Sequence, residues 1–359
     1  MKILFPKKSR ILTLSKIEKK EAPKDFFYGT LSFSKFDVNN SVIDTRPPRD
    51  FFFLNFINKI NNKFLRSNFS PQKANYIFNQ STSNSKIISF TDWDSINIGL
   101  YKKLRKDLKL ICGFHGLYDF FFRVPQNIFF NKKKLFIESL KNIDHIFFFG
   151  LEDKKKSIEF FKIPEKKTSH FNFGVDTNFW VKEKLDQPID ILSIGSDLNR
   201  DYEIFKKLKI KYNLTLITKL NVNFLKNKAN IIKGSKNTYN LSDIDIRNYY
   251  NQSKIIVVPV KETFQPSGNS VTLQAMACGK PVILSNIKGL WDKELLKDFK
   301  NIILVSPNDP KELEDKITLL LKDKRLRDKI GLNAAETARK YFSLERMNRD
   351  FNSLLKLKI

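Results

Sequence analysis

Short apolar runs alternate with amphipathic stretches along most of the chain. This alternation is typical of parallel strands joined by helices. The runs fall into two series. The first comprises residues 10–14, 42–44, 86–90, 108–114 and 145–149, and the second comprises residues 190–194, 214–218, 230–233, 255–260, 281–285 and 302–305. We therefore expect an α/β protein with two α/β domains in tandem.

The amphipathic stretches between these runs predict helices. Asp94 is expected to cap a helix that reaches about residue 106, because Ile96, Leu100 and Leu104 recur at intervals of four residues. Another helix is expected over residues 127–141.

Two further helix signals stand near the end of the sequence. Asp309, Pro310 and Glu312 combine a capping side chain with a proline at the first helical position. A last helix is expected from Ser343. Its predicted apolar face comprises Met347, Phe351, Leu354 and Leu355.

The segment HFNFGVDTNFW (170–180) separates the two series of strands. It has no clear period and contains Gly174 among several aromatic residues, which indicates a junction between domains. The expected domains are residues 1–172 and 173–341. A helix over residues 342–359 is expected to pack back towards the first domain.

Composition limits the class of protein. With 359 residues, 41% of them hydrophobic, the chain can form two cores of ordinary size. The longest apolar run, HIFFFGL (145–151), is far shorter than the roughly 18 residues of a membrane-spanning helix, and no signal peptide is expected. Two distant cysteines, Cys112 and Cys278, and only three histidines argue against a zinc site and favour a reducing, cytoplasmic setting.

The formal net charge of +27 suggests nucleic acid or an anionic membrane surface as a partner. However, Lys outnumbers Arg 52 to 13, and Asn, Ile and Phe are also abundant, as an A/T-biased genome would produce. Proteins that bind nucleic acid favour Arg for phosphate and base contacts. We therefore expect no nucleic-acid partner, and a weak peripheral contact with an anionic membrane stays open.

The sequence TFQPSGNSVTLQAMACGKPVIL (263–284) departs from this composition. It predicts a loop and a short helix between two buried strands, with Gly279 just after the helix. Gly268 allows close approach of a ligand to the backbone. Ser267, Asn269 and Ser270 place polar groups at the helix start, where phosphate binds readily. The alternative is an ordinary tight turn, because glycine-rich loops are common.

This segment resembles the donor-site segment of GT-B glycosyltransferases of family 4, in which a glycine-containing loop precedes Glu-Ala-Met-Ala-x-Gly-x-Pro-Val. Four other stretches resemble the family in the same order: FGVDTNFW (173–180), ILSIGSDLNRDYEIF (191–205), NDPKELEDKITLLLKD (308–323) and KYFSLERM (340–347). The resemblance covers about residues 173–350 and is thin over residues 1–170.

The resemblance implies roles for the residues of the second domain. The loop at Gly268, Asn269 and Ser270 would hold the donor diphosphate through backbone N–H groups. Arg200 stands at the basic position of the family that neutralises this diphosphate. Gln274 stands where the family usually has a glutamate that binds the ribose hydroxyls.

Two positions depart from the family. Ser196 follows Gly195 in the first loop of the nucleotide domain, where the family has a second basic residue. Pro266 occupies the position of another family glutamate. The nearest polar substitutes on the sugar side are Glu262, Gln265 and Ser267.

The first domain offers His115 in ICGFHGLYDFF (111–121), just after a predicted strand. The family often has a histidine there that contacts the donor sugar, and the alternative is a histidine satisfied within its own domain. Asp92 follows another predicted strand and is an acceptor-side candidate. The sequence DWD (92–94) is explained by a turn and a helix cap rather than by a metal site.

The resemblance thus implies a glycosyltransferase of the GT-B fold, whose two Rossmann-like domains face one cleft. It would move a sugar from a UDP- or GDP-sugar to an acceptor hydroxyl, with retention of configuration and without a metal or other cofactor. The acceptor would be a carbohydrate, a lipid-linked molecule or a small molecule, as in cell-surface glycan synthesis. A nucleotide-sugar epimerase or phosphorylase on the same fold, and a non-catalytic basic binding protein, are the alternatives.

Overall fold

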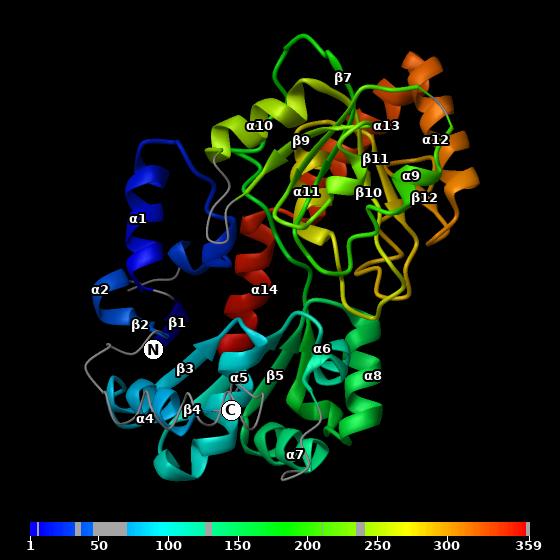
Figure 1. The fold of residues 1–359 in the computed structure, drawn as a ribbon. Helices are drawn as coiled ribbons and strands as arrows, with labels where there is room; N and C mark the ends of the chain where they lie inside the picture. The colour runs from blue at the N-terminus through cyan, green and yellow to red at the C-terminus, as the bar shows by residue number, and fades with distance from the viewer. Residues whose placement is uncertain are drawn as a thin grey trace. The chain divides into compact units, whose positions relative to one another are not determined.

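A computed structural model describes residues 1–5, 7–32, 37–45, 70–125, 131–209, 211–234 and 241–356. The chain divides into two compact units (Figure 1). Unit 1 comprises residues 1–15, 33–171 and 352–359, and unit 2 comprises residues 16–32 and 172–351.

Unit 1 is built on a parallel six-stranded sheet in the order β2-β1-β3-β4-β5-β6. Its strands are β1 (Lys2–Phe5), β2 (Val42–Asp44), β3 (Lys86–Ser89), β4 (Lys109–Phe114), β5 (His145–Phe148) and β6 (Thr168–His170). The helices that alternate with them include α4 (Pro71–Asn79), α5 (Asp92–Tyr101), α6 (Leu117–Arg123), α7 (Lys132–Asn142) and α8 (Leu151–Phe161). Every strand of this sheet pairs in parallel, as expected for strands joined by helical crossovers.

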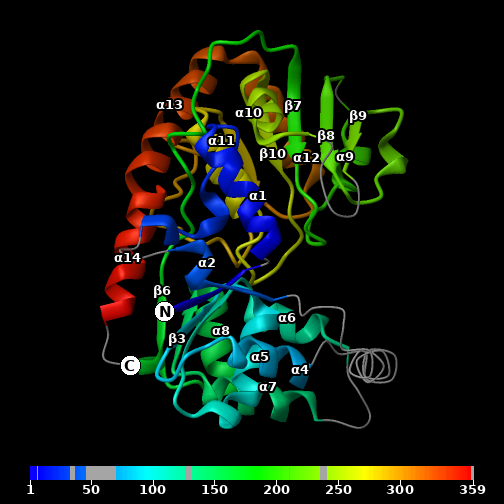
Figure 2. The ribbon, with the colours of Figure 1, turned by 90° about the vertical axis from the view of Figure 1, so that its left-hand side faces the viewer.

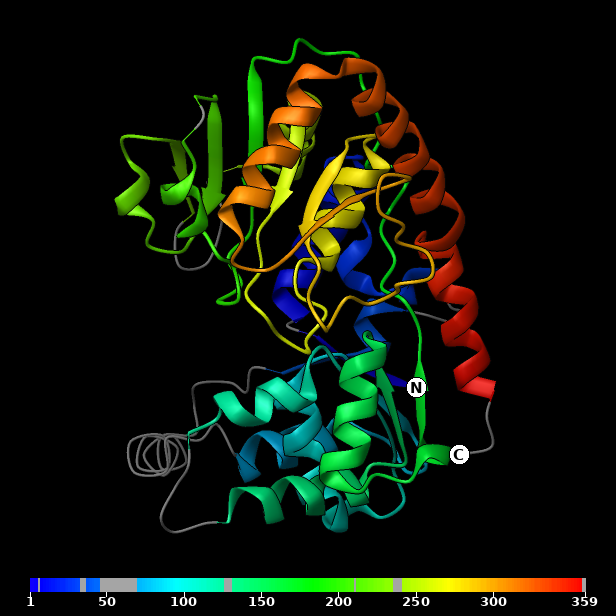
Figure 3. The ribbon, with the colours of Figure 1, turned by 90° about the vertical axis from the view of Figure 1, so that its right-hand side faces the viewer.

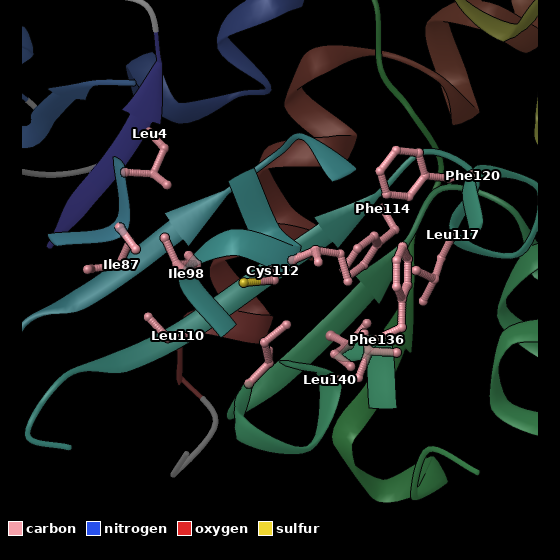
Figure 4. Packing of buried hydrophobic residues seen from close by; sticks show 14 of the residues in the cluster. Leu4, Ile87, Ile98, Leu110, Cys112, Phe114, Leu117, Phe120, Phe136 and Leu140 are labelled. Carbon is pink, nitrogen blue, oxygen red and sulfur yellow. The ribbon is translucent and has the colours of Figure 1, made fainter. Parts of the chain in front are cut away.

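The core of unit 1 is rich in aromatic side chains. Phe114 and Cys112 of β4 lie beside Phe136 and Leu140 of α7 in the same buried cluster (Figure 4). Because β5 and all of β4 after Lys109 are buried, they appear in the sequence as continuous runs of mostly apolar residues.

Unit 2 repeats this architecture with the order β12-β11-β10-β7-β8-β9. The strands are β7 (Ile189–Ile194), β8 (Leu214–Thr218), β9 (Asn230–Lys233), β10 (Ser253–Val258), β11 (Val282–Ser285) and β12 (Ile303–Val305). Helices α10 (Asp243–Asn251) and α11 (Asn269–Ala277) cover one face of the sheet, and α9 (Ile204–Lys207) and α12 (Pro310–Lys322) cover the other (Figures 2 and 3). Helix α13 (Lys324–Tyr341) packs against α11 and α12.

The predicted strands appear in the structure with one exception. Residues 10–14 lie in helix α1 (Lys7–Glu18), so the strand expected there is wrong. Ile11 and Leu12 are exposed on this helix, so the apolar run does not mark a buried element. The first strand is instead β1, which has only four residues. Strand β6 was also not predicted, because it has only three residues and contains no apolar run.

Of two predicted helix caps, one is confirmed and one is wrong. Asp309 caps α12 as predicted, because its carboxylate accepts the Glu312 N–H at 2.9 Å. The cap predicted at Asp94 is wrong: Thr91 is the N-cap of α5, and its hydroxyl donates to the Asp94 carboxylate, which lies inside the first turn. The helix predicted over residues 127–141 begins at Lys132, and residues 126–130 lie outside the described part of the chain.

The boundary between the units falls between Phe171 and Asn172, inside the predicted junction. Residues 16–32 belong to unit 2 although they precede most of unit 1 in the sequence. The last helix, α14 (Leu344–Lys356), belongs to unit 2 as far as Phe351 and to unit 1 from Asn352. Its buried face contains Met347, Phe351 and Leu354.

Candidate functional site

Gly268 forms the turn between β10 and α11 in unit 2. It is the N-cap of α11 and adopts a left-handed conformation, with φ of 86°. A Cβ atom at this position would lie 2.9 Å from Val258 Cγ1 and 3.0 Å from Arg200 Nη1. Only glycine fits both this backbone angle and this space. The start of α11 therefore lies at the carboxyl edge of a parallel sheet, where open α/β sheets bind ligands.

Arg200 lies against the same turn. Its residue is only 6% exposed, and its Nε and Nη1 atoms have no hydrogen-bond partner among the residues that the structure describes. A Cβ atom on Gly195, just after β7, would clash with Arg200 Nε. The guanidinium group is thus enclosed between two glycines. Since buried donors are rarely left unpaired, this arrangement points to an anionic ligand.

Hydrogen bonds hold the segments on either side of Arg200. The Ser267 hydroxyl donates to the Asp197 carboxylate, and the Asn199 amide donates to Gln265 Oε1 at 3.5 Å. The backbone of Arg200 also forms an antiparallel bridge with Val260. These contacts join the loop after β7 to the loop after β10.

The other polar residues predicted for this loop contact backbone groups. Glu262 Oε1 accepts the Lys288 N–H at 2.8 Å, and Asn269 Oδ1 accepts the Ser270 N–H at 2.6 Å. Ser196 Oγ accepts the Lys219 N–H at 2.8 Å and so connects the end of β7 to the end of β8. Ser196 thus contacts the backbone at the end of the neighbouring strand β8. The resembling family usually has a basic residue after this glycine, and that positive charge is absent here.

Gln274 lies inside unit 2 and is only 7% exposed. Its Nε2 donates to Asp25 Oδ2 at 2.9 Å, and its Oε1 accepts the Tyr250 hydroxyl at 3.2 Å. Asp25 was not anticipated from the sequence, because no motif or period marks residues 16–32. Burial raises the pKa of Asp25 to about 7, against the lowering effect of hydrogen bonds from Gln274, Asp176 and Trp180.

Unit 1 brings together His115 and Asp92, which follow the neighbouring strands β4 and β3. The His115 backbone N–H donates to Asp92 Oδ1 at 3.2 Å, and the His115 ring stacks on Phe149 with ring centres 4.6 Å apart. Burial lowers the pKa of His115 and raises the pKa of Asp92, and the charge of each partner opposes these shifts. The imidazole is therefore biased towards its neutral form.

Asp153 is a second carboxylate of unit 1 that the sequence did not reveal. It is fully buried and accepts the N–H groups of Leu117 and Tyr118 at 3.0 and 2.9 Å, so it caps α6 from α8. Burial raises its pKa to about 8. This carboxylate fixes the helix that directly follows His115 and Gly116.

Within the described ranges, no group of three or more His, Cys, Asp or Glu side chains is arranged to hold a metal ion. No helix in the same ranges is both long and apolar enough to cross a membrane.

Comparisons with known proteins point to one family. Residues 198–337 match the family model described as glycosyl transferases group 1. The chain is 28% identical over 179 residues to the uncharacterized glycosyltransferase MJ1178 of Methanocaldococcus jannaschii, covering 48% of this chain and 44% of that protein. It is also 28% identical over 169 residues to N,N'-diacetylbacillosaminyl-diphospho-undecaprenol alpha-1,3-N-acetylgalactosaminyltransferase of Campylobacter jejuni, covering 45% of this chain and 43% of that protein. The chain thus spans less than half the length of either relative.

Solved structures share the fold at low sequence identity. Anabaena HepE in complex with UDP-glucose has a TM-score of 0.60 and 16% identity, covering 75% of this chain and 78% of that chain. Sucrose-phosphate synthase from Thermosynechococcus elongatus has a TM-score of 0.62 and 17% identity, covering 87% of this chain and 80% of that chain. Two parallel α/β sheets and this likeness show that the chain has the GT-B fold, and residues 198–337 of unit 2 match the family model of group 1 glycosyltransferases.

Proposed function

We propose that this protein transfers a sugar from a nucleotide-diphospho-sugar to an acceptor hydroxyl. The observation that carries the proposal is the buried guanidinium of Arg200, whose Nε and Nη1 have no partner among the described residues and which lies beside Gly268 at the start of α11. A diphosphate would supply the missing acceptors and would also interact with the positive end of the helix dipole. The complex of HepE with UDP-glucose supports a UDP-sugar as donor, and a GDP-sugar is the alternative.

Other residues take supporting roles in this proposal. The backbone N–H groups of Asn269 and Ser270 would bind the diphosphate together with Arg200, and the Ser270 N–H would exchange its present acceptor, Asn269 Oδ1, for a phosphate oxygen. As the bond to the sugar breaks, these groups would stabilise the negative charge that develops on the leaving diphosphate. Ser267 holds Asp197 and so keeps the loop after β7 against the loop after β10.

The ribose and the sugar would be bound by the polar groups that follow β10. Gln274 keeps one N–H and one lone pair beyond its bonds to Asp25 and Tyr250, and these are the groups proposed to bind the ribose. Glu262 and Gln265 are proposed on the sugar side. By the resemblance to glycosyltransferase family 4, the reaction would retain the anomeric configuration, and the leaving phosphate would assist deprotonation of the acceptor.

Unit 1 would contribute His115 as the catalytic residue and Asp92 on the acceptor side. A neutral imidazole can donate a hydrogen bond to a sugar hydroxyl without introducing a positive charge. The lowered pKa of His115 supports this role. No metal ion has a part in the proposed reaction.

The acceptor is proposed to be a carbohydrate or a lipid-linked sugar, as in cell-surface glycan synthesis. The Campylobacter relative, whose name states an undecaprenol-linked acceptor, supports this choice. The protein would act in the cytoplasm, where nucleotide sugars are available, and its charge of +27 supports a peripheral contact with the anionic inner face of the membrane.

A thermal-shift panel of UDP, GDP, ADP and CDP tests the donor site. One of them at about 100 times its dissociation constant should stabilise the protein by roughly 2.7 kcal/mol, and the matching nucleoside should have a much smaller effect. If none of the four shifts the melting temperature, the donor site is refuted. The matching nucleotide sugar is then incubated without acceptor, and formation of an epimer would favour an epimerase instead.

A further inference from the structure

The segment Lys16–Ser32 is held by unit 2 at several separate points. The Lys24 N–H donates to Asp176 Oδ2 at 3.1 Å, and the ring of Tyr28 packs edge-on against Phe173 at 5.9 Å. Gly29 has a φ of 74°, and a Cβ atom there would lie 3.3 Å from Asn348 Cα in α14. These contacts place the segment against residues 173–176 and against helix α14.

Asp25 is the most deeply buried charged group of this segment. It is 0% exposed, and its carboxylate accepts three N–H groups: the Asp176 backbone, Trp180 Nε1 at 2.8 Å and Gln274 Nε2 at 2.9 Å. An asparagine has the same shape, but its NH₂ group would face at least one of these donors. The pocket is therefore built for an acceptor with two oxygens.

The orientation of the Gln274 amide matches the Asp25 carboxylate. Tyr250 donates to Gln274 Oε1, so the NH₂ group is turned towards Asp25. A glutamate at position 274 would place a second carboxylate against Asp25 away from water, which is strongly unfavourable unless one of the two is protonated. The acid at position 25 and the amide at position 274 are thus complementary, and this explains an amide where the resembling family usually has an acid.

Gln274 also belongs to the helix that starts at the candidate donor site. It lies five residues after Asn269 on the nine-residue helix α11, whose N-cap is Gly268. We propose that Asp25 is a positioning residue: by fixing the Gln274 amide, it holds α11 and its N-terminal N–H groups in place to bind the donor diphosphate. The positioning role rests on the proposed function, whereas the pairing of residues 25 and 274 does not.

A charge-exchange cycle in the full chain tests this proposal with Asp25→Asn, Gln274→Glu and the double variant. Asp186→Asn and Gln187→Glu, two exposed positions in the same unit, serve as controls for the change in charge. Each protein is measured for melting temperature and, by calorimetry, for affinity towards the nucleoside diphosphate that the thermal-shift panel selects.

We expect each single variant to lose roughly tenfold in nucleotide affinity, because a small displacement of a positioned group has a large effect on binding. The double variant should recover part of this loss and of the melting temperature, because the amide introduced at position 25 can donate to the carboxylate introduced at position 274, while Trp180 Nε1 still lacks its acceptor. The two controls should behave as wild type. Asp25→Asn changes no volume, so it keeps the test available even if Gln274→Glu does not fold.

Additive effects of the two changes would overturn the pairing. Equal nucleotide affinity in wild type and Asp25→Asn would overturn the positioning role while leaving the proposed function in place. Absence of nucleotide binding by the wild type would instead refute the proposed function, and the positioning role would fall with it.

Discussion

Arg200 shows how a single buried charge can mark a ligand site. Its guanidinium group is removed from water, and two of its nitrogens have no partner among the described residues. Leaving such donors unpaired costs stability in the free protein. In the proposed function this cost would be offset when the donor diphosphate binds, as at other functional sites that sacrifice stability.

Replacing Arg200 with Ala should weaken nucleoside diphosphate binding by about 1.5–3 kcal/mol, or roughly ten- to more than a hundredfold. Binding of the free nucleoside should change far less, because it has no phosphate. Calorimetry with both ligands makes the comparison, and Arg325→Ala, at an exposed position on α13, is the control. Equal losses for the two ligands would place Arg200 away from the phosphates.

The buried carboxylate of Asp153 should make the stability of the protein depend on pH. Its folded-state pKa of about 8 lies above the unfolded value of 3.8, so the folded state binds the extra proton between these values. Its contribution to stability is greatest below about pH 4 and is lost as the pH rises through 8. Asp153→Asn removes this titration but leaves one of the two N–H groups of α6 without an acceptor.

Denaturant unfolding of wild type and Asp153→Asn between pH 5 and 9 measures the effect. The stability of the wild type relative to the variant should fall as the pH rises across this range. A difference that does not change with pH would show that Asp153 titrates normally.

Helix α11 contributes both to the candidate anion site and to the buried interior of unit 2. Its first residues form the candidate anion site, and its later residues Thr272 to Ala277 are buried against the sheet and α13. Gly268 determines where the helix begins, because its positive φ redirects the chain after the loop that follows β10.

Gly268→Ala should therefore lose nucleotide binding and some stability together. The added Cβ atom meets Val258 and Arg200, and the left-handed angle costs a non-glycine residue about 1 kcal/mol more than glycine. Gly150→Ala is a matched control, because Gly150 is the N-cap of α8 with an ordinary φ of −140°. Wild-type nucleotide affinity in a folded Gly268→Ala protein would contradict the assignment of this loop.

At the scale of the whole molecule, the proposed contacts divide between the units. All the proposed nucleotide contacts belong to unit 2, whereas His115 belongs to unit 1. Because the proposed nucleotide contacts and the proposed catalytic residue belong to different units, one variant can test nucleotide binding and catalysis separately.

His115→Ala should leave nucleotide affinity nearly unchanged and lower turnover by about a hundredfold or more, as expected for a group that acts mainly in the transition state. If His115 is only a packing residue on Phe149, the variant should instead melt at a lower temperature and keep near-normal turnover. Turnover, nucleotide affinity and melting temperature measured on one preparation decide between the two.

The sequence alone predicted the two series of strands, because parallel strands buried on both faces need continuous apolar runs. It also predicted the turn at Gly268, the end of α11 at Gly279 and the cap at Asp309, since each depends on residues within a few positions of one another. The resemblance also depends on short local motifs, and through one of them it indicated Arg200 as a candidate for diphosphate binding.

The tertiary structure decided what depends on distant partners. Asp25 and Gln274 are 249 positions apart, and only folding shows that they share one buried hydrogen bond. Residues 10–14 form a helix rather than a strand, and residues 16–32 join unit 2, although no local pattern indicates either. Burial and pairing are properties of the folded neighbourhood, so the sequence could name the chemical groups but not which of them meet.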